Sequence, residues 1–400
     1  MNWCHDANTF SRVSSRSATF AIAGLGVTPM GRIYGKTATA FAREAVQLAV
    51  ADAGLAMSDI DGLLINSPGD LSLQLQRGLG LRDLKVLAEV QAYGSSAGAM
   101  IQYAGLAVEH GMANTVVCVF ADAPLKEGVS AGAYSGTRRT YNGFSALGFA
   151  AGYGGANPRY AMAARRHMLS YGTTTDQFGA VAVQQRAWAA MNPDAQMREP
   201  MSLDDHRASR WIAEPLRLLD CCLVSNGGVA VIVTSADRAR TLRQPPAYVL
   251  GWGQAHPGIV QERGSRFGEV SGAIESGARA FAMAGLRKDD VDVCQLYDCY
   301  TYTVVVSLED YGFCDKGEGG PFAASGVLGP GGSLPTNTGG GQLSSFYMWG
   351  MTPISEGVLQ ARGTAGERQV DRHDVVLVSG NGGILDHHST MLLSPHAKVD

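Results

Sequence analysis

The chain has 400 residues, 46% hydrophobic and 17% charged, and its 32 Lys+Arg against 36 Asp+Glu give a net charge of -4. This balance lacks the dense positive charge that nucleic acid attracts, so we expect no nucleic-acid partner. No apolar run reaches the roughly 18 residues of a membrane-spanning helix, so we expect no membrane insertion.

The number and spacing of the cysteines bear on the compartment of the protein and on whether it binds a metal. The seven cysteines include no CxxC pair, and no Cys/His set has the spacing of zinc ligands. We therefore expect no metal in this chain. An odd number of cysteines in a long chain without a secretory signal predicts reduced thiols and a cytoplasmic protein.

The composition along the sequence predicts a leader followed by two halves. Residues 1–18 are polar and lack an apolar core, which indicates a flexible leader. Residues 19–244 are the predicted N-terminal half, with an insertion rich in helix formers at about 124–217. Residues 245–400 are the predicted C-terminal half.

A repeat supports two related halves. Residues 45–66 indicate a helix, then Gly54, an acidic pair and a short apolar strand, and residues 276–297 repeat this order around Gly285. The two glycines are 231 positions apart, and the matched residues keep that offset. A glycine after a helix supplies the positive φ that ends it. The repeat therefore predicts duplicated α/β halves, with chance similarity as the lesser alternative.

Apolar runs and helical periodicity predict the remaining elements. Expected strands cover residues 86–92, 115–120 and 375–378, with a strand pair over 223–233 and the second half starting at 245–252. Expected helices run from the turn at Gly94 to about residue 110, over 160–168 and 177–191 in the insertion, and from about 344 to 361.

Motifs spread over residues 19–395 resemble the thiolase superfamily, and within it the branch of sterol-carrier protein x and lipid-transfer proteins. The matching stretches are 21–29, 53–62, 192–193, 215–217, 226–228, 297–300, 337–341 and 379–383. The resemblance implies a thiolase fold, in which two βαβαβαββ halves form five αβαβα layers. It also implies a homodimer and coenzyme A thioester chemistry.

The residues at the catalytic positions of a thiolase differ here. The slot of the nucleophilic cysteine falls on Gly94, which cannot form an acyl-enzyme, and the two histidine slots hold Tyr297 and Tyr347. The final Cys-x-Gly loop matches residues 379–382, which contain no cysteine. This pattern resembles the thiolase-like steroid side-chain aldolases, in which two tyrosines replace the histidines.

That resemblance implies a carbon–carbon lyase that cleaves a β-hydroxyacyl-CoA, for example a steroid side-chain thioester, into a carbonyl product and a short acyl-CoA. Tyr297 and Tyr347 would be the catalytic pair, and a small OB-fold, zinc-ribbon protein the partner. A free tyrosine has a pKa of about 10, so the basic phenol needs a lowered pKa or a relay. Asp298, His387 and His388 are candidate relays.

Further residues are predicted to bind the substrate. They are the turn residues Gly94 and Ser95, then Asn337, Gly340, Gly341, Gly382 and His388. The missing cysteine side chain is expected to leave room at Gly94 for a fully substituted carbon, and backbone N–H groups near 380–383 are expected to hold the enolate oxygen. The pairs 138–139 and 165–166, all arginines, are candidates for the CoA phosphates or for a solvated surface.

Two alternatives remain open. The chain could be a thiolase-type acyltransferase that uses Ser95, Ser96 or Cys299 as its nucleophile. It could also be a non-catalytic acyl-CoA- or lipid-binding subunit. For an enzyme of either kind the coenzyme A thioester is the expected substrate, and no covalently bound cofactor is expected.

Overall fold

The computed structural model describes residues 17–66, 72–129, 144–258 and 264–399. Most of the predicted leader and the arginine pair 138–139 lie outside these ranges. Within them, no helix combines the length and the apolar character needed to cross a bilayer.

Helices and strands alternate along the chain, as an α/β fold requires. The strands are β1 (Phe20–Val27), β2 (Gly62–Asn66), β3 (Val86–Glu89), β4 (Thr115–Asp122), β5 (Trp211–Ala213), β6 (Leu216–Arg217), β7 (Gly227–Ser235), β8 (Ala247–Ala255), β9 (Val293–Gln295), β10 (Val376–Gly382) and β11 (His387–Ser394). The helices are α1 (Ala38–Ala53), α2 (Ser72–Leu79), α3 (Ser96–Glu109), α4 (Phe144–Ala150), α5 (Ala156–Tyr171), α6 (Thr175–Ala190), α7 (Leu203–Ala208), α8 (Ala236–Ala239), α9 (Ala273–Ala284), α10 (Thr301–Asp310), α11 (Gly319–Ala324) and α12 (Met351–Arg362).

Nine of the eleven described strands form one sheet with an internal symmetry, and β5 and β6 form a separate pair. The order of the nine-stranded sheet is β3-β2-β4-β7-β1-β8-β11-β10-β9, so that β1-β7-β4-β2 on one side corresponds to β8-β11-β10-β9 on the other. Pairing directions correspond as well: β4 and β7 are antiparallel like β10 and β11, and β2 and β4 are parallel like β9 and β10. The duplication predicted from the repeat is confirmed.

Alternate strand residues face different helices, which defines the layers. On β2, Leu63 and Ile65 pack with α1, whereas Leu64 packs with α3. On β10, Val376 and Val378 share the core around α3 and α12, whereas Leu377 faces the outer core that includes α9. Most residues of α3 and α12 are buried, because these helices lie between the two half-sheets. The order α1, sheet, α3 with α12, sheet, α9 gives the five expected layers.

The repeat is also visible in the backbone. Gly54 ends α1 with φ 73°, and Gly285 ends α9 with φ 69°. A short 3₁₀ turn follows each glycine and leads into β2 or β9. The same helix cap therefore sets the entry angle of the corresponding strand in each half.

Replacing Gly54 with alanine is expected to lower the free energy of unfolding by about 1–2 kcal/mol, because a Cβ disfavours positive φ. The new methyl would also lie 3.0 Å from the Cβ of Arg243. Gly54→Asn is the matched control with a smaller expected loss, since asparagine tolerates this conformation. Urea denaturation measures both, and an alanine variant as stable as the native chain would contradict this role for Gly54.

Two expected elements were wrong in detail. Residues 223–225 are not strand, so the expected strand pair is the single strand β7. The helix expected from residue 344 begins at Met351, because Phe346 is extended and Trp349 has φ 48°. The Met348 N–H donates to the Thr352 hydroxyl at 2.9 Å instead of continuing a helix. Tertiary contacts override the local periodicity there.

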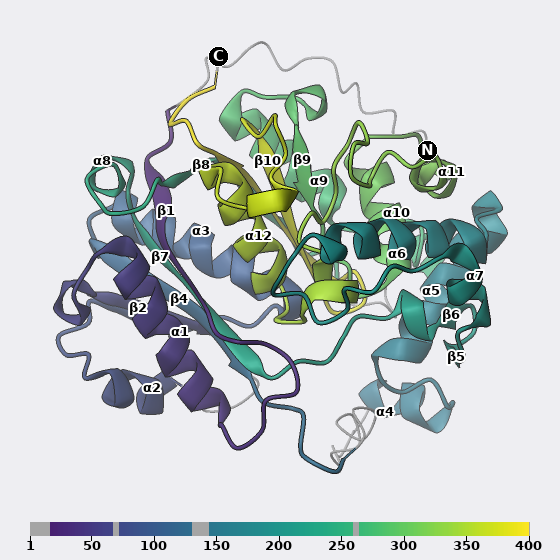
Figure 1. The fold of residues 1–400 in the computed structure, drawn as a ribbon, viewed down its shortest axis with the longest axis horizontal. Helices are drawn as coiled ribbons and strands as arrows, with labels where there is room; N and C mark the ends of the chain where they lie inside the picture. Colours follow the sequence, from purple (N-terminus) through teal and green to yellow (C-terminus); the bar gives the residue numbers. More distant parts are fainter. Residues whose placement is uncertain (1–16, 67–71, 130–143, 259–263, 400) are drawn as a thin grey trace.

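The segment between β4 and β7 carries the helices α4 to α7 and the β5–β6 hairpin. Figure 1 shows this segment beside α10, on the side of the molecule away from α1. Phe178 of α6 shares a core with Tyr302 of α10, their ring centroids 6.2 Å apart. The predicted boundary at 244/245 falls in the turn before β8, and the domain limits themselves stay predictions.

Candidate active site

The structure brings Tyr297 and Tyr347 into contact. Their hydroxyl oxygens are 3.1 Å apart, within hydrogen-bond distance. Tyr297 follows β9, and its backbone N–H donates to the Ser379 hydroxyl at 3.1 Å. Tyr347 lies in the non-helical segment before α12, and its N–H donates to the Ser225 hydroxyl at 3.1 Å. Serine side chains from two distant segments therefore fix the backbones of the pair.

Gly94 lies directly against the Tyr297 ring. A Cβ built on Gly94 would overlap ring carbons of Tyr297 and the carbonyl oxygen of Asn381. The expectation that the missing cysteine leaves room for substrate at Gly94 was therefore wrong, because the tyrosine ring occupies that space. The glycine in place of the thiolase cysteine therefore makes room for the tyrosine in place of the histidine at position 297.

The Gly94 turn leads into a central helix. Residues Tyr93–Ser95 form a 3₁₀ turn, and α3 begins at Ser96, whose hydroxyl accepts from the Ala92 N–H at 2.7 Å. The N-terminus of a helix carries a partial positive charge, and here it lies beside Gly94. The fully buried Ser95 hydroxyl has no hydrogen-bond partner within the described ranges, so no base among those residues activates it.

Two further phenols lie near the pair. The Tyr160 hydroxyl of α5 donates to the Gly383 carbonyl at 2.7 Å and accepts from Asn381 Nδ2 at 3.1 Å. Its ring centroid is 4.5 Å from that of Tyr300, whose hydroxyl donates to Asn157 Oδ1 at 2.5 Å. Sequence reasoning missed Tyr160 and Asn381, because the contact joins positions 221 residues apart.

Burial controls the ionisation of the site. It raises the pKa of the Tyr297 hydroxyl well above the usual value, and the neighbouring Tyr347 raises it further. Burial also raises the pKa of the Cys299 thiol to about 12. Both groups are neutral near pH 7, and a neutral thiol is a poor nucleophile.

The predicted relay residues have other partners. The buried Asp298 carboxylate accepts from the backbone N–H of Gln342 at 2.9 Å and of Leu343 at 3.3 Å. His387 Nδ1 is 2.9 Å from Nδ1 of His256, and His388 Nε2 is 3.0 Å from the Tyr311 hydroxyl. Asp298 therefore holds the turn at 341–345 that precedes Tyr347.

Burial raises the pKa of Asp298 to about 7, against hydrogen bonds from the backbone. Between about pH 4 and 7 the unfolded chain loses this proton and the folded chain keeps it, so this group makes folding less favourable as pH rises. The Asp298→Asn variant should therefore gain unfolding free energy relative to the native chain over that range. Urea denaturation across pH tests this, with the exposed Asp289→Asn as control, and equal pH slopes would contradict it.

The other predicted binding residues divide into two groups. Gly382 packs on the backbone of the Gly94 turn, close to the tyrosine pair. Asn337 Oδ1 accepts from the Leu296 N–H at 2.7 Å, next to Tyr297, while Gly340 and Gly341 have positive φ and open the turn that Asp298 holds. Their substrate contacts stay predictions.

The arginine pair of α5 is engaged at the surface. Arg165 Nη2 is 3.0 Å from Glu214 Oε1, and Arg166 Nε is 3.2 Å from Glu269 Oε1. These ion pairs fit the surface alternative better than a free phosphate site.

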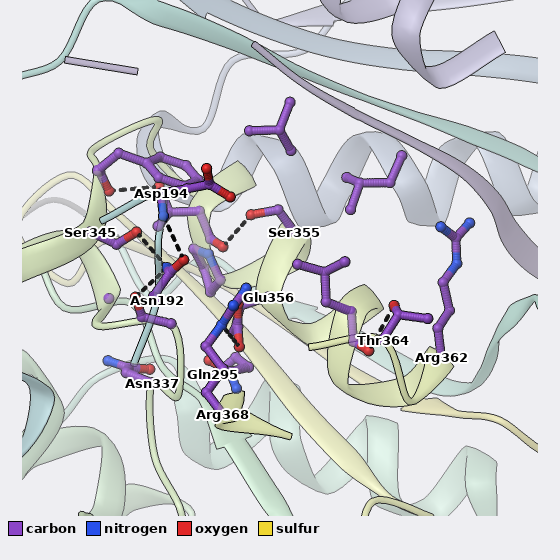
Figure 2. Close-up of a pocket in the computed structure, with 18 of the residues that line it drawn as sticks. Asn192, Asp194, Gln295, Asn337, Ser345, Ser355, Glu356, Arg362, Thr364 and Arg368 are labelled. Carbon is purple, nitrogen blue, oxygen red and sulfur yellow. Dashed lines mark hydrogen bonds and ion pairs between the residues drawn. The ribbon is translucent and has the colours of Figure 1, made fainter. Parts of the chain in front are cut away.

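A cavity of about 450 Å³ lies next to the segments that carry Tyr297 and Tyr347 (Figure 2). Leu296 and Asp298, on either side of Tyr297, line it, as do Ser345 and Phe346 just before Tyr347. The two tyrosines themselves are not among its lining residues. Figure 2 shows its polar walls, which include the ion pair of Glu356 and Arg368 at 3.0 Å and the bond from Asn192 to Ser345 at 3.3 Å.

Among the residues described, no group of three or more His, Cys, Asp or Glu side chains is placed to bind a metal ion. The candidate site contains the phenols of Tyr297 and Tyr347 and the N-terminus of α3. Such groups transfer protons and stabilise a developing oxyanion.

Known proteins match most of the length of the chain. A family model described as thiolase C-terminal domain-like matches residues 253–395. A steroid side-chain-cleaving aldolase of Thermomonospora curvata is 40% identical over 373 residues, covering 90% of this chain and 95% of the relative. The 17-hydroxy-3-oxo-4-pregnene-20-carboxyl-CoA lyase of Mycobacterium tuberculosis is 38% identical over 377 residues, covering 92% and 97%. The solved Ltp2-ChsH2(DUF35) aldolase has a TM-score of 0.86 at 38% identity, covering 95% and 99%.

Proposed function

Since the chain belongs to the thiolase-superfamily aldolases that act as acyl-CoA lyases, we propose that Tyr297 and Tyr347 carry out its carbon–carbon bond cleavage. The substrate is a β-hydroxyacyl-CoA, and the products are a ketone or aldehyde and a shortened acyl-CoA. The observation that carries the proposal is the 3.1 Å contact between the two hydroxyl oxygens.

The two phenols form a proton relay. The β-hydroxyl gives its proton to Tyr347, Tyr347 passes its own to Tyr297, and Tyr297 protonates the α-carbon. The electron pair of the breaking Cα–Cβ bond forms the enolate that accepts this proton, and the C–O bond becomes the carbonyl. One proton thus moves from the β-oxygen to the α-carbon, and both tyrosines are neutral again at the end.

The raised pKa of Tyr297 supports this relay. A phenolate base would be a minor species at neutral pH, whereas a relay requires neutral phenols throughout. Tyr297 is 4% exposed and Tyr347 half-buried. We therefore assign Tyr347 to the substrate hydroxyl and Tyr297 to the α-carbon.

The thioester oxygen requires stabilisation as the enolate forms. The N-terminus of α3 beside Gly94 and the glycine-rich end of β10 at residues 380–383 are the groups that support such a site. Both lie against the Tyr297 ring, where the α-carbon would receive its proton.

An acyltransferase of the same fold has less support. It needs an activated nucleophile, whereas Cys299 has a raised pKa and the Ser95 hydroxyl has no partner among the described residues. A non-catalytic binding subunit would not require two hydrogen-bonded phenols in the histidine slots.

The named relatives guide the choice of substrate and partners. Two are named for steroid side-chain cleavage or a steroid carboxyl-CoA, so we propose a β-hydroxyacyl-CoA on a steroid side chain. The name of the Ltp2-ChsH2(DUF35) aldolase supports a DUF35 partner, for which we propose a small OB-fold, zinc-ribbon protein. Strand β3 ends the described sheet with three of its four residues exposed, which supports a homodimer.

The test is turnover of a β-hydroxyacyl-CoA with a tertiary β-carbon, by the full chain co-expressed with its DUF35-type partner. Mass spectrometry should find equal amounts of ketone and shortened acyl-CoA without added free coenzyme A. A thiolase reaction would need free coenzyme A and a β-keto substrate. No ketone from the assembled complex, or cleavage that depends on free coenzyme A, would overturn the proposal.

A further inference from the structure

We propose that Tyr160 is a positioning residue that joins the helical insertion to residues 381–383, which comprise the end of β10 and the start of the turn after it and are called the loop. This inference rests on the proposed function for its kinetic consequence. The link itself is a structural feature that is tested separately.

Tyr160 makes two hydrogen bonds to residues 381–383. Its buried hydroxyl donates to the Gly383 carbonyl at 2.7 Å and accepts from Asn381 Nδ2 at 3.1 Å. The two bonds engage a backbone group and a side chain of the same short loop. One phenol therefore restrains both the path of that loop and the orientation of the Asn381 amide.

Residues 381–383 lie close to the Tyr297 ring. The Asn381 carbonyl oxygen and the nearest carbons of the Tyr297 ring both lie closer to the point that a Cβ of Gly94 would occupy than van der Waals contact allows. A shift of residues 381–383 would consequently move one wall of the Tyr297 ring. A displacement of about 1 Å in a catalytic group can cost on the order of 100-fold in rate.

The hydrogen bonds of Tyr160 join two parts of the molecule that are far apart in the sequence. Tyr160 belongs to α5 in the insertion, and the loop belongs to the second half of the fold. In the first turn of α5, Asn157 Oδ1 accepts from the Tyr300 hydroxyl at 2.5 Å, and the rings of Tyr160 and Tyr300 contact each other at a tilt, with centroids 4.5 Å apart. Hydrogen bonds therefore join the insertion to the segments after both β9 and β10. Of the two phenols, only Tyr160 bonds to residues 381–383.

The pair Tyr160→Phe and Tyr300→Phe separates positioning from packing. Each change removes one hydroxyl from the same pair of contacting rings and leaves the ring. Only the first removes bonds to residues 381–383. Asn381→Ala removes one of those bonds from the other side and serves as a second variant.

Hydrogen exchange and steady-state kinetics measure the effect on the full chain with its partner. Tyr160→Phe and Asn381→Ala should accelerate amide exchange in the peptide covering residues 379–386, and Tyr300→Phe should not. In turnover, Tyr160→Phe should lower kcat by about 10- to 100-fold with KM within about threefold. Tyr300→Phe should stay within about threefold in both constants, and the Tm of each variant checks the fold.

The outcomes are distinguishable. Native exchange and native kcat in Tyr160→Phe would overturn the proposal, and so would equal losses in the two phenylalanine variants, which would indicate a packing role. If the native complex cleaves no β-hydroxyacyl-CoA, the proposed function fails, and the exchange experiment alone then decides whether Tyr160 restrains the loop.

Discussion

Replacing Tyr297 with phenylalanine is expected to lower kcat for β-hydroxyacyl-CoA cleavage by about 10²- to 10⁴-fold, the usual contribution of general acid–base catalysis. The phenylalanine ring fills the same space beside Gly94, so the fold and KM should change little. Only the hydroxyl that bonds to Tyr347 at 3.1 Å is lost. Product formation followed by mass spectrometry, with thermal unfolding as the check on folding, measures the effect.

A relay makes a sharper prediction for the double variant. If the two hydroxyls act as one unit, Tyr347→Phe should cost about as much as Tyr297→Phe, and the double variant should be little worse than either. Independent roles would instead give roughly multiplied losses. Tyr302→Phe is the matched control, because its hydroxyl donates to the Gly268 carbonyl at 2.6 Å in the core. Native turnover in both catalytic variants would exclude the mechanism.

Local signals predicted the parts of the molecule that repeat. The 231-residue offset predicted two related halves because each helix ends at a glycine with positive φ, Gly54 or Gly285, before its strand. The resemblance to thiolase motifs predicted Tyr297 and Tyr347 as a pair, and the structure joins them by a hydrogen bond. Their catalytic role stays a proposal, since contact alone does not establish chemistry.

Features set by long-range contacts were not predicted. Tyr160 sits in a helix of ordinary periodicity, and nothing within α5 indicates that its hydroxyl meets Gly383. The segment before α12 has the composition of a helix, but bonds to Ser225 and Thr352 hold it in a non-helical conformation. The space at Gly94 was misjudged for the same reason, because the ring that fills it comes from a residue 203 positions later.

Gly94→Ala is expected to lower kcat by about 100-fold or more, because the added methyl would displace the Tyr297 ring or the loop beside it. The overlapping atoms include the Asn381 carbonyl oxygen, which is backbone and cannot turn aside like a side chain. Overpacking of this kind typically lowers the free energy of unfolding by about 1–3 kcal/mol. Turnover and urea denaturation of the purified complex measure the two losses.

Gly78→Ala in α2 is the control, since a Cβ there has no heavy atom within 4 Å. It should leave turnover unchanged and raise the free energy of unfolding by up to about 1 kcal/mol through helix propensity. Gly94→Cys extends the argument, because a thiol in the thiolase slot would compete with the Tyr297 ring for the same space. It should therefore lose lyase activity without gaining a labelled acyl-enzyme. An active, stable Gly94→Ala protein would show that the ring does not need this position for catalysis.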